Sequence, residues 1–173
     1  MSRCLLVFLI LAGISVNFGC GNREPIRLEY QMGERATNGP LTYNVIESRS
    51  VSQLGDLLRL RLPQQRFLVI SISITNGGGS EISVPLLSVE GANGQLHRES
   101  DNGEGVSNWL GLLRSLGPAQ TAQGNLLFDV PLGSYRLRLP DGAETGSEKY
   151  IWVQIPLRVD SDAPVEAPIP GKQ

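Results

Sequence analysis

The stretch from Arg66 to Asn76 constrains the fold of this chain more than any other part of its sequence. Its residues run Arg-Phe-Leu-Val-Ile-Ser-Ile-Ser-Ile-Thr-Asn, and from Ile70 onward isoleucine alternates with serine or threonine. A period of two places every isoleucine on one face of a β-strand, and β-branched side chains suit that pleated surface. Three glycines follow Asn76 and favour a turn, because glycine adopts positive φ without strain. The stretch is therefore predicted to be the central strand of a β-rich core.

Shorter segments with similar alternation occur along the rest of the chain. We expect strands over the ranges 41–47, 58–62, 82–90, 95–98, 124–131, 135–139 and 150–157. The 20 glycines and 11 prolines are scattered between apolar segments, as is typical of a protein with many turns. An all-β chain with about seven or eight strands predicts an antiparallel β-sandwich, which we place at residues 41–158. Residues 159–173, rich in proline and acidic side chains, are predicted to be a disordered tail.

One segment, residues 107–118, leaves two interpretations open. Ser107 or Asn108 suits the N-cap of a short helix, and Gly117-Pro118 would end it. The apolar residues between them have helical spacing: Trp109, Leu112, Leu113 and Leu116. The alternative is an irregular strand.

The N-terminal segment has the composition of a secretory signal. Arg3 supplies a positive charge, and residues 4–16 are almost wholly apolar. This run is too short for a comfortable membrane span of about 20 residues. We therefore expect a signal-peptide helix within residues 1–19.

The residues after this apolar run resemble the lipobox of bacterial lipoproteins, in which a small residue precedes a cysteine. By that resemblance Cys20 carries a diacylglyceryl group, cleavage falls after Gly19, and residues 20–40 form a lipidated tether or a first edge strand. Asn17 and Phe18 depart from the usual pattern, so a plain signal peptide or an uncleaved anchor are alternatives. Two or more acyl chains would anchor the domain stably to a membrane. In a Gram-negative cell, the absence of aspartate after the cysteine favours the outer membrane.

Four segments, in the order found here, resemble a known family. They are the strand Phe67–Thr75 ending at Asn76, then Gly91-Ala-Asn-Gly94, Leu116-Gly-Pro118 and Gly124-Asn-Leu-Leu-Phe-Asp-Val-Pro131. The series is similar to bacterial and archaeal extracytoplasmic domains of unknown function with an immunoglobulin-like fold. That family is related to a small secreted mycobacterial immunogenic antigen. The resemblance covers about Leu41 to Leu157. It implies an immunoglobulin-like sandwich outside the cytoplasm, often in a lipoprotein, and supplies no catalytic or ligand-binding residues.

Metal and catalytic chemistry have little support in the residue types. Both cysteines, Cys4 and Cys20, lie in the N-terminal segment, and His97 is the only histidine. No disulfide, Cys/His metal site or cofactor is therefore predicted for the domain. A catalytic histidine needs a nucleophile and an orienting partner, and the nearby Ser100 and Asp101 lack a recognisable motif. A surface histidine is the simpler interpretation, and no enzymatic activity is predicted.

An acidic loop is a candidate calcium site. Glu99, Asp101, Asn102 and Glu104 surround Gly103. Ca²⁺ takes several oxygen ligands, which such a loop would supply. The spacing departs from that of known calcium loops, so we favour a solvated turn.

Two sets of side chains are candidates for an interaction surface. Four arginines on expected strands would meet an anionic polymer or lipid headgroup if these strands share a sheet: Arg59, Arg61, Arg136 and Arg138. Three aromatic residues would form an exposed patch for a protein or glycan partner: Trp109, Tyr150 and Trp152. The alternatives are a solvated polar face for the arginines and burial under loops for the aromatic residues.

A formal net charge of −2 and the lack of a basic cluster predict no nucleic-acid partner. The favoured function is a lipid-anchored, non-catalytic interaction or structural module of the cell envelope, whose partner is an unidentified envelope protein or polymer. The alternative is a small-ligand- or ion-binding lipoprotein that assists transport, which would need a pocket with converging polar groups. An envelope hydrolase would require clustered carboxylates or a catalytic triad.

Overall fold

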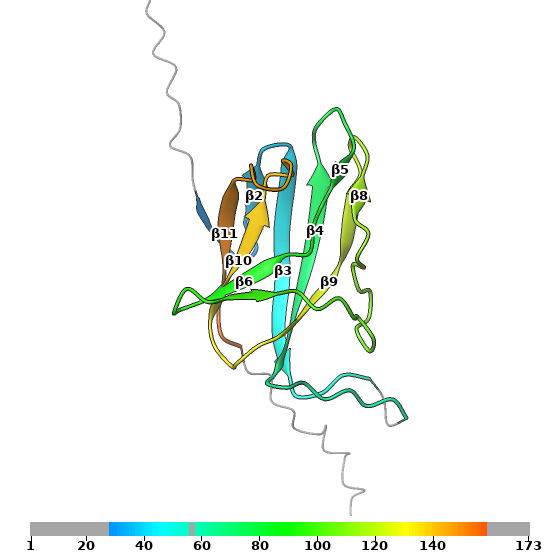
Figure 1. Cartoon of the computed structure of the whole chain (residues 1–173), viewed down its shortest axis with the longest axis vertical. Helices are drawn as coiled ribbons and strands as arrows, with labels where there is room; N and C mark the ends of the chain where they lie inside the picture. The colour runs from blue at the N-terminus through cyan, green and yellow to red at the C-terminus, as the bar shows by residue number, and fades with distance from the viewer. Residues whose placement is uncertain (1–27, 56–57, 159–173) are drawn as a thin grey trace, which may run out of the picture.

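Two β-sheets packed face to face form the domain in a computed structural model, which describes residues 28–55 and 58–158 (Figure 1). The strands of these residues are β1 (Glu29–Gln31), β2 (Arg35–Asn38), β3 (Leu41–Val51), β4 (Phe67–Asn76), β5 (Ile82–Ser83), β6 (Ser88–Gly91), β7 (Leu96–Arg98), β8 (Ser115–Leu116), β9 (Thr121–Asp129), β10 (Tyr135–Pro140) and β11 (Tyr150–Ile155). One sheet has the order β1-β11-β10-β6-β7 and the other the order β2-β3-β4-β9, while β5 and β8 form a separate pair. The predicted all-β, immunoglobulin-like sandwich is confirmed, with more strands than expected, because the range 82–90 is divided between β5 and β6.

The predicted central strand is β4, which lies between β3 and β9 in the four-stranded sheet. Ile70, Ile72 and Ile74 are fully buried. They belong to one hydrophobic core with residues of the opposite sheet such as Leu137 and Val153. The period of two therefore identified both the strand and its core-facing side.

A β-bulge in β3 changes which residues face the core. The pairing of β3 with β4 shifts between Val45 and Glu47, so that Ile46 is an extra residue. Before the bulge odd-numbered residues point inward, whereas after it Ser48 is buried. Glu47 and Arg49 consequently lie on the outer face of the sheet.

The sandwich begins before residue 41, where the expected domain boundary was placed. β1 pairs in parallel with β11, and β2 pairs antiparallel with β3. Ala36 is fully buried and Tyr30 packs against the core, so contacts with apolar residues hold both strands in place. Residues 29–38 are therefore edge strands of the two sheets.

The expected strand at 58–62 is absent. A single isolated bridge joins Leu54 and Arg61. The alternating leucines do not face the core, and their exposed fractions are 93%, 52% and 68% for Leu58, Leu60 and Leu62. Alternation was misleading here because this segment lies in the loop that extends past the end of β3 and β4, where no sheet edge is available (Figure 1).

The helix considered for residues 107–116 is also absent. Asn108 has a φ of 48° and Gly111 a φ of 82°, values that an α-helix does not allow. Leu116 is buried where β8 pairs with β5, whereas Leu113 is 97% exposed. The irregular-strand alternative is the correct one.

The signal segment with Cys20 and the tail at 159–173 lie outside the described residues. Within residues 28–55 and 58–158, no helix is long and apolar enough to cross a bilayer.

Candidate interaction surface

The outer face of the five-stranded sheet carries four of the seven residues predicted to form an interaction surface. Arg136 and Arg138 come from β10, and Tyr150 and Trp152 come from β11. They alternate with buried residues of the same strands, so their side chains share the face that points away from the core. The antiparallel register places Arg138 opposite Trp152. We call these four residues the arginine–aromatic face.

Arg136 joins four strands through its guanidinium group. It donates to Glu29 of β1 at 2.8 Å and to Glu90 of β6 at 2.7 Å. The second oxygen of Glu90 accepts a hydrogen bond of 2.9 Å from Trp152 Nε1. The guanidinium carbon lies 5.8 Å from the centre of the Trp152 ring, a cation–π distance. The side chains on this face are therefore held in place before any partner binds.

The contacts in this network keep Glu90 and Arg136 charged at neutral pH. The hydrogen bond from Arg136 lowers the pKa of the Glu90 carboxyl below its ordinary value. The same contact raises the pKa of Arg136. The side chain of Arg136 is 37% exposed and that of Glu90 17%, so water screens the pair only in part.

Arg138 also contacts an aromatic ring, but unlike Arg136 it pairs with no carboxylate in the described residues. Its guanidinium carbon lies 3.4 Å from the centre of the Tyr150 ring. The sheet register then continues from Arg138 to Ser88 of β6 and to Arg98 of β7. Neither Arg138 nor Arg98 forms an ion pair in the part of the chain that the structure describes. Stacking leaves the in-plane N–H groups of an arginine available for a carboxylate or phosphate.

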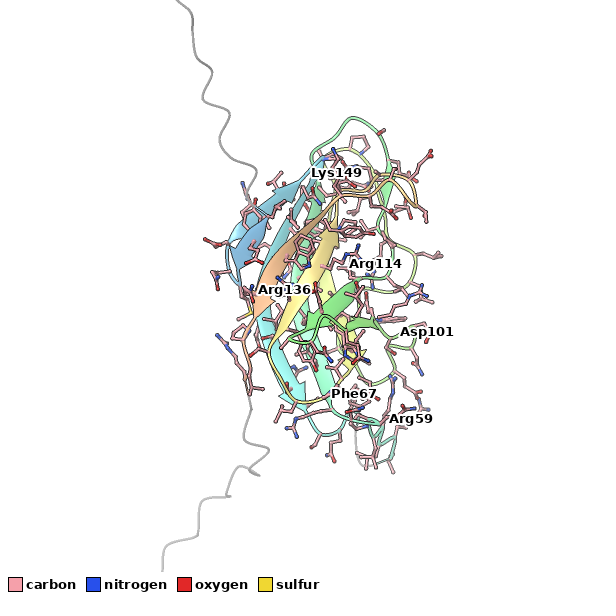
Figure 2. The ribbon with its side chains drawn as sticks, turned by 60° about the vertical axis from the view of Figure 1, so that its left-hand side comes forward. Arg59, Phe67, Asp101, Arg114, Arg136 and Lys149 are labelled. Carbon is pink, nitrogen blue, oxygen red and sulfur yellow. The ribbon has the colours of Figure 1, made fainter. Side chains whose placement is uncertain are left out.

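The other two predicted arginines lie elsewhere, so no four-arginine surface forms. Arg59 is in the loop between β3 and β4, distant from Arg136 (Figure 2). Arg61 donates to the carbonyl oxygens of Asn102 at 2.8 Å and of Glu104 at 3.3 Å. Its guanidinium carbon also lies 5.1 Å from the centre of the Phe67 ring. Arg61 therefore holds the loop that contains Asn102 and Glu104 in place.

The same contacts argue against the calcium site. Glu99 is buried and forms a two-point ion pair with Arg114, so it does not face the loop. The carbonyl groups of Asn102 and Glu104 are occupied by Arg61. No group of three His, Cys, Asp or Glu side chains is placed to hold a metal ion within the described ranges. The guanidinium of Arg61 lies where the sequence suggested a metal ion.

The lone histidine has a structural neighbour. His97 is half-buried, and its ring meets the ring of Tyr135 edge-on at 6.0 Å. Ser100 instead bonds within its own loop, donating to the Asn102 carbonyl at 3.0 Å. No hydrogen bond joins His97 to Ser100 or Asp101 in the described residues.

Trp109 does not join the aromatic patch. It forms a parallel bridge with Asn125 of β9, beside the four-stranded sheet. A Cβ atom on Gly103 would lie 1.9 Å from its ring, so the indole packs directly against that glycine. Only Tyr150 and Trp152 of the three predicted aromatic residues lie together.

Glu29, Glu90 and Arg98 of this sheet were not predicted from the sequence. Their positions follow from strand pairing, which alternation within one strand does not reveal. The available signal was weak: Glu90 flanks the apolar Val89, and Arg98 follows the Asn93-Gly94 hairpin turn, which brings β7 beside β6.

Comparison with known proteins identifies the architecture. A family model described as a domain of unknown function (DUF4352) matches residues 30–150. The yjhA protein from Bacillus subtilis has a similar structure, with a TM-score of 0.57 and 19% sequence identity over 73% of this chain and 98% of that chain. The ycdA protein of the same organism, a candidate lipoprotein, has a TM-score of 0.55 and 16% identity over 70% of this chain and 38% of that chain.

A third structure is the secreted protein MPT63 from Mycobacterium tuberculosis. Its TM-score is 0.49 and its identity 12%, over 75% of this chain and 97% of that chain. No curated protein matches the sequence. At these identities the two Bacillus subtilis structures establish the fold alone.

Proposed function

This chain belongs to the DUF4352 family of domains of unknown function, as its sequence resemblance predicted, and from that membership we propose that it is a non-catalytic interaction module anchored to an extracytoplasmic membrane surface. The signal-like segment and Cys20 support the anchor, and the candidate lipoprotein of the same fold is consistent with it. In a Gram-negative cell the outer membrane is the proposed location. The arginine–aromatic face is the observation that carries the interaction role.

The composition of this face suits a protein partner. Tryptophan, tyrosine and arginine are the residue types that most often dominate the binding energy of interfaces. Here Trp152 and Arg136 are already fixed by Glu90, so little side-chain entropy remains to be lost on binding. The free N–H groups of Arg138 and Arg98 would donate hydrogen bonds to an acidic side chain of the partner.

Reversing the charge at Arg138 tests the role of the face. In intact envelopes, chemical crosslinking of the anchored protein followed by mass spectrometry should identify a reproducible partner. We expect Arg138→Glu to reduce that crosslinked product at least tenfold, because a carboxylate would replace the guanidinium and repel an acidic group. The matched control is Arg59→Glu, the same change on a distant loop, which should leave the product unchanged. An equal yield from Arg138→Glu and the wild type would rule out this face.

The lipid anchor has a separate test. Metabolic labelling with a palmitate analogue should label the wild-type protein and fail in Cys20→Ala, since the thiol is the acceptor of the lipid. Cys4→Ala is the matched control because it removes the only other cysteine. Equal labelling of Cys20→Ala and the wild type would disprove the anchor.

The alternative function, a ligand-binding lipoprotein that assists transport, has one observation in its favour. A polar groove lies on the opposite side of the sandwich, on the outer face of the four-stranded sheet.

A further inference from the structure

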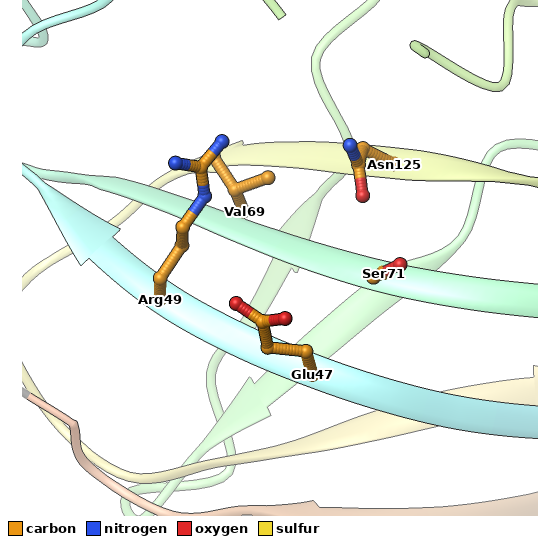
Figure 3. A pocket seen from close by; sticks show the side chains of 5 residues that line it. All are labelled: Glu47, Arg49, Val69, Ser71 and Asn125. Carbon is orange, nitrogen blue, oxygen red and sulfur yellow. The ribbon is translucent and has the colours of Figure 1, made fainter. Parts of the chain in front are cut away.

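Two adjoining cavities form a groove across β3, β4 and β9. One has a volume of about 220 Å³ and the other about 300 Å³, and Ser71 and Asn125 line both. Figure 3 shows Glu47 and Arg49 rising from β3 on the same side as Ser71 and Asn125. We call this feature the Ser71 groove. It lies on the opposite side of the molecule from the arginine–aromatic face, so it is independent of the proposed interaction role and concerns the ligand-binding alternative.

The groove is a consequence of side-chain size and register. Ser71 of β4 lies between Glu47 of β3 and Asn125 of β9 in one row across the sheet. The short serine leaves a depression between the longer side chains. The β-bulge after Val45 places Glu47 on this row, so an irregularity in the sheet directs a carboxylate over the depression.

The polar groups around the depression are free to bind a ligand. Glu47 and Arg49 make no hydrogen bond or ion pair within residues 28–55 and 58–158, although they lie on the same face of β3. The Nδ2 of Asn125 donates to the Ser107 carbonyl at 2.7 Å, which leaves its Oδ1 as an acceptor. Gln123 adds an exposed amide farther along β9.

The rim beside β9 is held by close backbone contacts, and it contains a strained backbone angle and an unsatisfied hydrogen-bond donor. The backbone of Asn108 accepts from Asn125 N at 2.8 Å, and Leu110 N donates to the Asn125 carbonyl at 3.0 Å. A Cβ atom on Gly124 would lie 2.6 Å from the Asn108 carbonyl oxygen, so only glycine allows this approach. Asn108 has a φ of 48°, and Trp109 Nε1 is buried without a partner in the described part of the chain. Such costs are most often found at binding sites.

We propose that the Ser71 groove binds a saccharide chain. Sugar hydroxyl groups both donate and accept hydrogen bonds, and the groove offers a carboxylate, a guanidinium, a hydroxyl and several amides. Amide side chains also match the N–H and C=O groups of an N-acetylated sugar. The ring of Trp109 supplies an apolar contact at the end of the groove. From β3 to the rim the groove crosses three strand spacings, about 14 Å, which is enough for a short oligosaccharide.

Other ligand classes fit less well. Glu47 beside Arg49 would repel a phosphate or carboxylate, and the two charges sum to zero. The floor of the groove consists of β3, β4 and β9, and at Asn125 the outer edge of β9 is already bonded to the backbone of Asn108 and Leu110, so no free backbone edge remains there for a peptide strand. The polar lining disfavours an apolar molecule.

The two tryptophans of the chain provide a direct test. In the full-length protein carrying Trp152→Phe, Trp109 is the only tryptophan, and its fluorescence reports on the groove. We expect chitotetraose to cause a saturable change in emission, with a weaker response to cellotetraose, which lacks the acetamido groups. Glu47→Gln should weaken binding about tenfold through the loss of one charge-assisted hydrogen bond. Ser71→Tyr should abolish binding by filling the depression.

A matched control and a folding check keep the test decisive. Arg138→Gln on the opposite sheet should leave the titration unchanged. Circular dichroism reports whether Ser71→Tyr is folded; if it is not, Glu47→Gln still tests the site. The proposal is overturned if neither saccharide gives a saturable change, or if the response survives Glu47→Gln and a folded Ser71→Tyr. It is also overturned if inorganic phosphate binds at the groove and the saccharides do not.

Discussion

Replacing Ile72 by aspartate is expected to leave no folded domain at 25 °C. Ile72 is fully buried at the centre of β4. The substitution removes about 1.5–3 kcal/mol of apolar burial. It also places a carboxylate in the core, which costs several kcal/mol more even if the group becomes protonated. Domains of this kind have a total stability of about 5–15 kcal/mol.

Urea unfolding followed by circular dichroism measures this effect. Ser73→Asp is the matched control, because it introduces the same side chain one residue later on the outer face of the same strand. That control should change the free energy of unfolding by less than about 1 kcal/mol. A similar unfolding midpoint for Ile72→Asp and Ser73→Asp would show that β4 is not the centre of the core.

Breaking the buried ion pair between Glu99 and Arg114 is expected to destabilise the domain by about 3–5 kcal/mol. The two side chains are at most 1% exposed. Arg114 donates to both oxygens of Glu99, at 2.9 Å for the Nη1–Oε2 contact, and also to the Gly111 carbonyl at 2.8 Å. Glu99 further accepts from the backbone N–H of Leu87 at 3.1 Å. Either single replacement, Glu99→Met or Arg114→Met, leaves a buried charged group without its partner.

A double-mutant cycle separates this loss from general repacking. Glu99→Met combined with Arg114→Met should recover most of the stability lost by Arg114→Met alone, because no charge is then left buried. Additive losses in the double variant would contradict a coupled pair.

The pH dependence gives a second measure of the same pair. Burial raises the pKa of the Glu99 carboxyl, and the hydrogen bonds from Arg114 and Leu87 oppose that increase. A carboxyl whose pKa is raised in the folded state favours folding when protonated and loses that contribution as the pH rises through its folded-state pKa. Arg114→Met removes the opposing contacts, so it should lose more stability, relative to the wild type, at pH 8 than at pH 5. An equal loss at both pH values would contradict this account.

Local patterns predicted much of the fold because strand periodicity is a short-range property. The alternation in β4, β9, β10 and β11 identified their core-facing residues correctly. The same signal failed at residues 58–62, where leucines alternate but no neighbouring strand is present. Alternation indicates which side chains lie on the same face of a strand. That face is buried only where a second sheet packs against it.

The candidate surfaces depended more strongly on long-range pairing. Arg136, Arg138, Tyr150 and Trp152 were predicted and lie together, because β10 and β11 are neighbours in the sheet. Arg59 and Arg61 were grouped with them only by residue type. The Ser71 groove was not predicted, since its row of residues comes from three separate strands and a bulge.

The segment from Leu112 to Leu116 shows most clearly what the sequence determines and what depends on the tertiary structure. The apolar spacing noted in the sequence grouped Leu113 with Leu112 and Leu116, yet Leu113 is 97% exposed and the charged Arg114 is 4% exposed. Arg114 is buried because Glu99, 15 residues earlier, supplies a carboxylate in the interior. The sequence by itself determined an all-β class, a central strand and the residues of its buried face, because these depend on neighbours in the chain. Only the tertiary structure decided which charged groups meet, because a buried charge is stable only where a distant residue compensates it.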